Sequence, residues 1–569
     1  MIRRTILRIT KRILPNNSLL RRVLKKLAIR LGLISPFYAD GRYREWVVST
    51  EKMFWTPQRD LGYKPLISII VPVFNAPEEY LLEAVYSVVN QTYGNWELLL
   101  VNASTLKVTR DATASCSNID SRIKVVDIHK NLGIAGNTNI GIKHATGEYI
   151  ALLDNDDTLA PEALYEVACE LQGSDKPDFL YSDEDKISPD SEQRFDPHFK
   201  AGWSLHTMRQ VNYLNHLTVL NAGMLKKAGG YQPGFEGAQD YDLYLRVIDA
   251  GAIVKHIPKI LYHWRAIATS TAANFSSKDN VLTAGKKALS DHLSRNGLQG
   301  EVTSIDNQPG FYDITYKASA LEVAIVILPS TDSQQYAEYT RQLMRLVSGV
   351  KGVHVYICNL KANKKMLSMY ENVLTSVHAD STEEYLTKVK NVSTAETMVF
   401  LGAALLWNEE DDWLERVAGF LGQCLDVDVV VPLIIDELSN RIIDAGSVKI
   451  GATEMPLFVG YPVGAHTFLG NSTWTRHLDR CSGRCIVVRK EAAAKIVASN
   501  PSSIEDIARA VTEFSRETIL WPRTKLNYAG DFRTVFTGGN DIMPIFCFSH
   551  QELSFDKSTY YIPSGADNA

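Results

Sequence analysis

The stretch YIALLDNDD, residues 149–157, decides the fold of this 569-residue chain. Its first five residues are apolar without interruption, which is typical of a strand buried on both faces of a parallel sheet. Four polar residues follow at once, and three of them are acids. Ligands of open α/β sheets bind beyond the carboxyl ends of the strands. We therefore expect a functional site at residues 154–157.

The residues before this stretch predict the rest of a parallel sheet. Residues 66–71 and 97–101 are two further apolar runs, and residues 79–90 between them carry apolar side chains at helical spacing. Strand, helix and strand in this order are typical of an α/β domain. We predict a catalytic α/β domain over residues 61–318, preceded by a separate segment over residues 1–60.

A second α/β pattern follows the predicted boundary. Apolar runs occur at residues 321–327, 353–357 and 398–401, in the same order as those of the first domain. This repetition predicts a diverged duplication over residues 319–569.

The acids after the strand suggest a metal site. Asp154, Asp156 and Asp157 would repel each other unless a cation were present. In extended backbone Asp154 and Asp156 point the same way, and hard oxygen ligands suit Mg²⁺ or Mn²⁺. Such a metal can neutralise the charge of a departing diphosphate. The alternative is a solvated turn, or a cap for the helix after Pro161.

A wider set of short motifs occurs along the first predicted domain. In chain order they are VPVFN at 71–75, NLG at 131–133 through NIG at 139–141, GEY at 147–149, LDNDD at 153–157, YSDEDK at 181–186, GAQDYDL at 237–243 and LYHWR at 261–265. Together these motifs resemble the family 2 inverting glycosyltransferases with the A-type fold. Within that family they are similar to the bacterial tandem-module subset that builds O-antigen and related polysaccharides, often rhamnosyltransferases. The resemblance covers about residues 64–317.

The resemblance implies a ligand set for the divalent metal, Mn²⁺ or Mg²⁺. Asp156 is expected to bind the metal, and Asp154 to contact the ribose of the nucleotide or the metal through water. His263 matches a histidine that completes the metal site, although a single histidine beside aromatic residues is also typical of packing. Asp157 is expected to cap the next helix, and the alternative is that it assists at the metal site.

Asp240 matches the catalytic base of the family. An inverting transfer needs one base on the acceptor side, and a carboxylate can accept the proton as the new bond forms. The family often has Glu before this residue, where this chain has Gln239. Asp240 could also cap the helix over residues 241–249, and the two roles are compatible.

The resemblance also implies a donor site for a nucleotide-sugar, either a UDP- or a dTDP-sugar. Pro72, Phe74 and Asn75 follow the first strand, where the family binds the nucleotide base. Asn102 stands where the family usually has an Asp, and its carbonyl oxygen can still accept from a pyrimidine N–H.

A second acidic group follows a short strand at residues 179–182. By resemblance Asp183 and Glu184 line the site of the donor sugar or the acceptor, and a solvated acidic loop is the alternative. Arg246 and Arg265 could contact phosphate or form ion pairs.

The second module lacks these groups. Gly402, Ala403 and Ala404 follow the strand that should lead to the acids, and residues 525–528 replace the strand with the histidine. The pair Glu505-Asp506 alone remains near the position of the base. We predict a catalytically inactive module that serves acceptor binding, partner docking or dimerisation.

The charge distribution predicts where the protein acts. Ten Lys and Arg residues lie in the first 34, so the remaining residues carry a formal charge near −15 (−5 − 10). An acidic body argues against nucleic acid as a partner. The basic segment has the pattern of an in-plane helix on an anionic membrane, and the alternatives are a helix packed on its own domain or a transit peptide.

Other features of the sequence favour the cytoplasm. The seven cysteines are scattered, which favours a reducing compartment, and no apolar stretch is long enough to span a bilayer. We predict a cytoplasmic protein bound peripherally to the inner membrane, acting on a glycan or a lipid-linked oligosaccharide.

Two other function classes compete with glycosyl transfer. One is a non-catalytic glycan-binding or scaffold protein of a polysaccharide assembly complex, and the other is a nucleotidyltransferase. An oxidoreductase is disfavoured because no Gly-x-Gly-x-x-Gly run follows the first strand.

Overall fold

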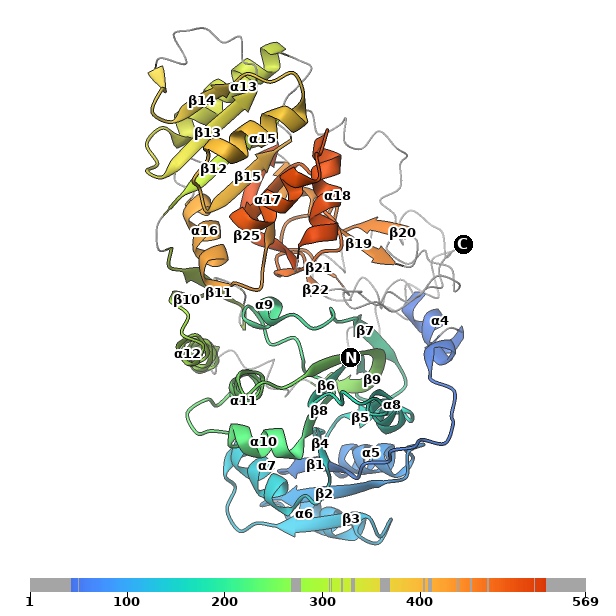
Figure 1. Cartoon of the computed structure of the whole chain (residues 1–569). Helices are drawn as coiled ribbons and strands as arrows, with labels where there is room; N and C mark the ends of the chain where they lie inside the picture. The colour runs from blue at the N-terminus through green and yellow to red at the C-terminus, as the bar shows by residue number, and fades with distance from the viewer. Residues whose placement is uncertain are drawn as a thin grey trace, which may run out of the picture.

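The computed structural model describes most of the chain between residues 42 and 528 (Figure 1). Two α/β modules lie one above the other in this view, the first in blue to green and the second in yellow to red. The basic segment predicted at the N-terminus lies outside the described residues. These are residues 42–49, 51–267, 278–305, 308, 310–318, 321–328, 333–358, 369–402, 405–407, 412–436, 440–450, 453–467, 470–481, 483–515 and 517–528.

The first module is built on a sheet of nine strands in the order β3-β2-β1-β4-β8-β6-β9-β5, with β7 beside β6. The strands β3, β2, β1 and β4 run parallel, and β8 runs antiparallel to both of its neighbours. The bounds are β1 Ile67–Val73, β2 Trp96–Asn102, β3 Ile123–Asp127, β4 Tyr149–Leu152, β5 Thr158–Leu159, β6 Phe179–Ile187, β7 Arg194–His198, β8 Thr218–Asn221 and β9 Val254–Arg265.

Helices pack on both faces of this sheet, as its fully buried strands require. Helix α7 packs closely on β1 at Gly141, where a Cβ atom would lie only 2.5 Å from Cγ2 of Ile70. The helices are α5 Glu78–Val89, α6 Lys107–Cys116, α7 Gly133–His144, α8 Ala163–Glu170, α9 Leu205–Met208, α10 Ala222–Ala228 and α11 Gln239–Asp249.

A short N-terminal segment, α4 (Arg42–Ser49) and the 3₁₀ turn η1 (Glu51–Phe54), packs against the β6–β7 hairpin. Arg194 of β7 binds Glu51 at 2.6 Å and Asp185 at 2.5 Å. The hydroxyl of Tyr43 donates to the same Asp185 at 2.6 Å. These contacts fix the side chain of Asp185, which belongs to the YSDEDK motif.

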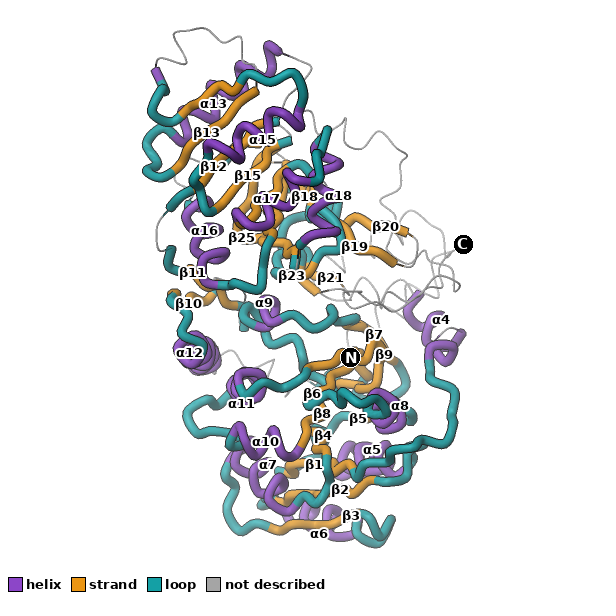
Figure 2. The backbone as a smooth tube through the Cα atoms, in the orientation of Figure 1, coloured by secondary structure: helices purple, strands orange, loops and turns teal. Residues whose placement is uncertain are grey.

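The second module repeats the strand order of the first. Its sheet runs β14-β13-β12-β15-β24-β17-β25-β16, with β18 beside β17 and β23 beside β25. Figure 2 shows these strands in orange between purple helices. Each strand except β23 has a counterpart of the same place and direction in the first sheet. The prediction of a second α/β module is confirmed, and the predicted boundary at residue 318 falls between β11 and β12.

The bounds of the remaining elements complete the description. The two modules are connected by α12 Lys278–Arg295, β10 Gly300–Ser304 and β11 Tyr312–Tyr316. The second sheet contains β12 Val323–Ile327, β13 Val353–Cys358, β14 Leu374–Val377, β15 Thr397–Leu401, β16 Leu405–Leu406, β17 Val429–Asp436, β18 Arg441–Asp444, β23 Arg476–His477, β24 Cys485–Arg489 and β25 Thr518–Tyr528. Its helices are α13 Ser333–Val347, α15 Thr382–Val392, α16 Trp413–Gln423, α17 Lys490–Ala498 and α18 Ile504–Phe514, and two hairpins comprise β19 Ser447–Ile450, β20 Thr453–Pro456, β21 His466–Thr467 and β22 Gly470–Asn471.

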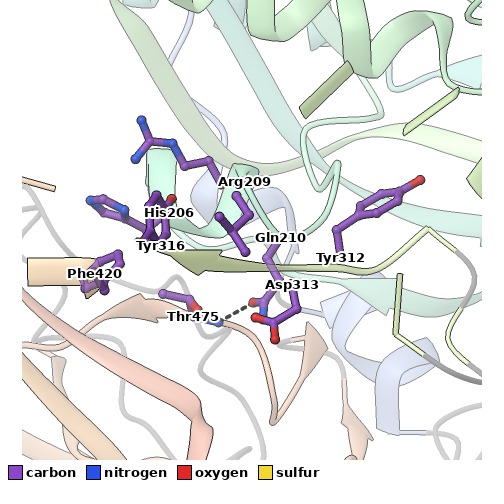
Figure 3. Close-up of a pocket in the computed structure, with 9 residues that line it drawn as sticks. His206, Arg209, Gln210, Tyr312, Asp313, Tyr316, Phe420 and Thr475 are labelled. Atoms are coloured by element: carbon purple, nitrogen blue, oxygen red, sulfur yellow. Dashed lines mark hydrogen bonds between the residues drawn. The ribbon is translucent and has the colours of Figure 1, made fainter. Parts of the chain in front are cut away.

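The two modules meet through buried polar contacts. Gln210, just after α9, accepts from the backbone N–H of Thr475 at 2.6 Å and donates to the carbonyl of Thr473 at 3.3 Å. Thr207 donates to the carbonyl of Thr475 at 2.6 Å. A small pocket opens beside these contacts, and Figure 3 shows the Gln210–Thr475 bond within it. In the described part of the chain, no helix is both long and apolar enough to cross a membrane.

Candidate active site

The acidic turn at residues 154–157 lies between the ends of three strands. It follows β4 and leads into β5, where Thr158 pairs with His263 near the end of β9. The side chain of Asn155 donates to the carbonyl of Pro72 in β1 at 2.8 Å. The turn is thereby fixed at the carboxyl edge of the sheet, where the sequence places a site.

Asp157 fixes the turn to β9 from inside the protein. Its carboxylate accepts from the hydroxyl of Tyr262 at 2.6 Å and from the backbone N–H of Arg265 at 2.7 Å. Burial raises the pKa of Asp157 to about 8, with repulsion from the neighbouring acids adding to the shift. The prediction that Asp157 caps the next helix is wrong, because α8 begins at Ala163 with Glu162 as its N-cap.

The side chain of Asp154 is exposed, and that of Asp156 is half-buried. No other described residue donates a hydrogen bond to their carboxylate oxygens. Although Asp154 reaches solvent, the surrounding protein desolvates it and raises its pKa to about 6, with Asp156 and Asp240 adding to the shift. Burial also raises the pKa of Asp156. Carboxylates crowded together without donors are the arrangement that a divalent cation stabilises.

His216 is a central group that the sequence did not suggest. Its ring stacks on Tyr262, with centroids 4.7 Å apart, just before β8 begins. Burial alone would lower its pKa, but the carboxylate of Glu184 raises the pKa of His216 to about 9, with Asp154 and Asp157 adding to the shift. A cationic imidazole therefore lies next to the acidic turn.

Glu184 holds His216 in place. Its Oε2 atom accepts from the backbone N–H of His216 at 2.6 Å and lies 2.9 Å from the ring Nδ1. The buried ammonium of Lys200 lies 4.0 Å from the same oxygen. Despite its burial, the carboxylate has a pKa well below its usual range, because Lys200, His198 and His216 favour its charged form.

Asp183 is fully enclosed by protein. Its Oδ1 atom accepts from the backbone N–H of Lys200 at 2.8 Å and lies 2.8 Å from Nε2 of His256. Its side chain is 0% exposed, so the contacts of Asp183 are with the protein interior. Neither this residue nor Glu184 lies in a solvated loop, since both are part of β6.

Asp240 lies in the first turn of α11, one residue after the helix begins at Gln239. The hydroxyl of Tyr231 donates to its Oδ1 atom at 2.7 Å. Burial raises the pKa of Asp240, while Tyr231 and His216 oppose the shift. The N-cap of α11 is Ala238, so Asp240 does not cap the helix. The charge of Asp240 acts on Asp154, which brings the two motifs into one site.

His263 is held by a carboxylate. Its Nδ1 atom lies 2.6 Å from Oδ1 of Asp185, which leaves Nε2 for another partner. Metal-bound histidines commonly have such a carboxylate behind them. The possible ligand atoms of His263, Asp154 and Asp156 do not all lie within 4.8 Å of one another. Among the described residues, the group of side chains that does have this spacing lies in another part of the protein.

The residues predicted to bind the nucleotide base lie at the ends of β1 and β2, with β3 next to them. Phe74 is 44% exposed, and Asn75 accepts from the backbone N–H groups of Thr105 and Leu106 at 2.9 and 3.0 Å. Asn102 accepts from the N–H of Ser104 at 3.2 Å and donates to Asp127 at 2.7 Å. The two hydrogen-bonding groups of Asn102 therefore have partners in the protein.

Two arginines of the site region form ion pairs within the protein. Arg246 binds Asp242 at 2.6 Å, and Arg265 binds Glu83 at 2.6 Å. Arg265 also donates from Nε to the carbonyl of Asp156 at 2.6 Å, so it supports the acidic turn.

The second module has different residues at the equivalent positions. Leu405 pairs with Tyr528 as Thr158 pairs with His263, so Tyr528 occupies the place of the histidine. Gly402 follows β15, where the first module has its acids. Asp506 accepts from the hydroxyl of Ser502 at 2.6 Å and stabilises the start of α18.

Comparison with known proteins agrees with this geometry. Residues 68–219 match the model of a family described as "Glycosyl transferase family 2". The matched stretch begins in β1 and ends in β8 of the first module. The strand order and the acids at the carboxyl edge fit the A-type nucleotide-sugar transferase fold.

Two curated relatives match beyond this domain. An uncharacterized protein, y4gI, of Sinorhizobium fredii is 36% identical over 48% of this chain and 30% of its own length. The O-antigen biosynthesis protein RfbC of Myxococcus xanthus is 28% identical over 80% of this chain and 36% of its own length. The chain thus spans about a third of the length of these relatives.

Among solved structures, the chain resembles S. aureus TarS 1-349 in complex with UDP-GlcNAc. The sequence identity is 17%, and the TM-score is 0.33 over 40% of this chain and 72% of that chain.

Proposed function

We propose that the first module is a metal-dependent inverting glycosyltransferase that moves a sugar, such as rhamnose, from a nucleotide-diphosphate donor to a growing cell-surface polysaccharide or lipid-linked glycan. The supporting observation is the convergence of Asp154, Asp156, His216 and Asp240 at one edge of the sheet. These four residues come from three separate segments of the chain, and the family match covers the three residues that precede residue 220.

The acidic turn fits a divalent metal, Mg²⁺ or Mn²⁺. Asp156 and Asp154 would hold it, with His263 as a further ligand through Nε2. Such an ion, when bound, neutralises the charge of the departing diphosphate. Asp157 and Arg265 fix the backbone of the turn, so the carboxylates are in place before the donor binds.

Asp240 is the proposed general base. As the acceptor oxygen forms its bond to the anomeric carbon, the proton of that hydroxyl passes to Asp240. The bond from the anomeric carbon to the phosphate oxygen breaks, and the nucleoside diphosphate leaves with the electron pair. The raised pKa of Asp240 makes its carboxylate a better proton acceptor, and Tyr231 fixes its orientation.

His216 is the proposed donor to the diphosphate. Its ring is cationic and adjacent to the acidic turn, so it can stabilise negative charge that develops there. Glu184 is its positioning residue, and Asp183 supports both through Lys200.

We assign recognition of the nucleotide base to the ends of β2 and β3. The base would be a pyrimidine, as in a UDP- or dTDP-sugar. The exposed carboxylate of Asp127 can accept from the pyrimidine N–H, and Asn102 holds that carboxylate at 2.7 Å. Pro72, Phe74 and Asn75 would form the adjacent wall of the base site.

The second module is proposed to bind the acceptor, a partner or a second copy of the chain. Its sheet is retained, but its strand end carries Gly402 in place of an acid. The ten basic residues near the N-terminus support a cytoplasmic protein bound peripherally to the inner membrane. Unchanged membrane partitioning after deletion of residues 1–34 would disprove that association.

Donor turnover tests the proposal. Release of nucleotide from UDP-, dTDP- and GDP-sugars is measured with Mn²⁺, Mg²⁺ or a chelator, in the presence of lipid-linked glycan. The wild type is compared with Asp156→Ala and with the control Asp111→Asn, whose acid lies on α6 and is 62% exposed.

The expected result is metal-dependent release of one nucleotide that persists in the control and is lost in Asp156→Ala. Absence of turnover with every donor would overturn the proposal and favour a glycan-binding or scaffold protein.

A further inference from the structure

A cluster of metal-binding side chains lies at the junction of the two modules, away from the donor site. His206, Asp426 and Glu517 place one ligand atom each within 4.8 Å of one another. His206 belongs to α9 of the first module. Asp426 and Glu517 precede β17 and β25 of the second. We propose that these three residues bind a Zn²⁺ ion that joins the modules.

The strand register explains why the two carboxylates meet. Val429, the first residue of β17, pairs with Thr518, the first residue of β25, and the strands run parallel. The backbone N–H of Val429 also bonds to the carbonyl of Glu517. Asp426 and Glu517 therefore lie just before the starts of neighbouring parallel strands, on the same edge of the sheet. Two acids in this position repel each other unless a cation lies between them.

His206 reaches this edge from the other module. Its Nε2 atom lies 3.0 Å from Oδ2 of Asp426, and its side chain is 2% exposed. The ring packs edge-on against Phe420, with centroids 5.2 Å apart, and Figure 3 shows both side chains at the module junction. Phe420 thus restricts the orientation of the ring, with Nε2 next to Asp426.

The distances suit a zinc ion. Zinc binds nitrogen and oxygen ligands at about 2.0–2.2 Å, which places tetrahedral ligand atoms roughly 3.4 Å apart. The spacing of 3.0 Å in the His206–Asp426 pair, and the limit of 4.8 Å for the group, bracket this value. A shift of less than about 1 Å per side chain would complete such coordination.

A second imidazole lies beside the cluster. Nε2 of His477 is 3.0 Å from Oε1 of Glu517. In its neutral form this nitrogen could serve as a fourth ligand, which would complete a tetrahedral set.

The cluster has an entry path. The side chain of Asp426 is 55% exposed, whereas that of His206 is covered. A hydrated ion can therefore reach the site from the side of Asp426. Without metal, a proton on His206 can bridge to Asp426, and this ion pair is the competing state.

Metal titration of the full, untagged chain tests the proposal. The donor site is removed with Asp156→Ala so that one site remains to be counted. Zn²⁺ alone is titrated by calorimetry, and Co²⁺ alone by the visible absorption of the bound ion. In this background Asp426→Asn and Glu517→Gln are compared with Glu415→Gln, an exposed acid on the nearby α16.

We expect one Zn²⁺ per chain in the Asp156→Ala background and in the control. Each cluster variant should weaken binding at least about tenfold, and the rise in melting temperature with Zn²⁺ should disappear with it. Circular dichroism checks that the variants are folded. Absence of stoichiometric binding, or binding unchanged in both cluster variants, would overturn the proposal whatever the result of the donor assay.

Discussion

Nδ1 of His216 lies 2.9 Å from Oε2 of Glu184, and the same oxygen accepts from the backbone N–H of His216. One carboxylate thus fixes both the ring and the backbone of the cationic side chain that we assign to the diphosphate. The pair makes the charge of His216, as well as its position, depend on Glu184.

Glu184→Gln should move the alkaline limb of the pH–rate profile to lower pH. His216 is cationic below its pKa, which Glu184 raises to about 9. The neutral amide keeps the shape of Glu184 but removes this effect, so the imidazole loses its proton at a lower pH. Activity near pH 8 should fall at least about tenfold and recover in part near pH 6. The NMR titration of the His216 ring gives the matching pKa, and an unmoved profile would contradict the assignment.

Asp240→Asn should lower kcat by about 10²–10⁴-fold with little change in donor affinity, because only proton transfer is lost. Tyr231→Phe removes the hydroxyl that donates to Asp240 at 2.7 Å and should have a smaller effect, about tenfold. Steady-state kinetics and calorimetry with nucleoside diphosphate separate the two quantities. Wild-type kcat in Asp240→Asn would exclude this residue as the base.

Each chain should bind one nucleotide. The second module has Gly402 after β15 and Tyr528 at the position of His263, so its described residues offer no counterpart of Asp154 or His263. Calorimetric titration of the full chain with UDP or dTDP and Mn²⁺ should give a stoichiometry near one, and no binding in Asp156→Ala. A stoichiometry near two would show that the second module binds nucleotide.

Glu97→Gln should lower stability most at neutral pH. The carboxylate of Glu97 accepts from Ser68, Thr146 and Lys124, and these contacts lower its pKa to about 2 although burial opposes the shift. A depressed pKa stabilises the fold above the ordinary value of 4.5, and this contribution is lost as the pH falls toward 2.

The expected cost of Glu97→Gln is about 1–3 kcal/mol at pH 7. Melting temperatures of both proteins, measured from pH 7 downward, should approach each other below about pH 4.5. A difference that stays constant over this range would show that the charge of Glu97 has no stabilising role.

The apolar runs of the sequence were sufficient to predict the parallel strands β1, β2 and β4, and β12, β13 and β15, but not the antiparallel strands β8 and β24 beside them. The runs at residues 66–71 and 321–327 are apolar except for Ser68 and Glu322, and such strands are buried inside a sheet. The repeated order of such runs also predicted the second module. The acidic turn at residues 154–157 could be located because it follows a buried strand directly.

His216 could not be predicted in the same way. No neighbouring residue distinguishes it, and its charge depends on Glu184, which is 32 residues away in the chain. Asp157 was misinterpreted because a cap is the ordinary local role of an acid before a helix, whereas its partners Tyr262 and Arg265 lie more than 100 residues further on. Contacts at this separation leave no local signal in one sequence.

The polar contacts between the modules have a practical consequence for expression of fragments. A recombinant first module ending near residue 318 would keep Thr207 and Gln210 but lose the backbone groups of Thr473 and Thr475 that they bind. Those donors and acceptors would be left without partners on a newly bared apolar surface, which favours aggregation. A soluble fragment therefore requires redesign of the α9 surface, whereas the chain that keeps both modules does not.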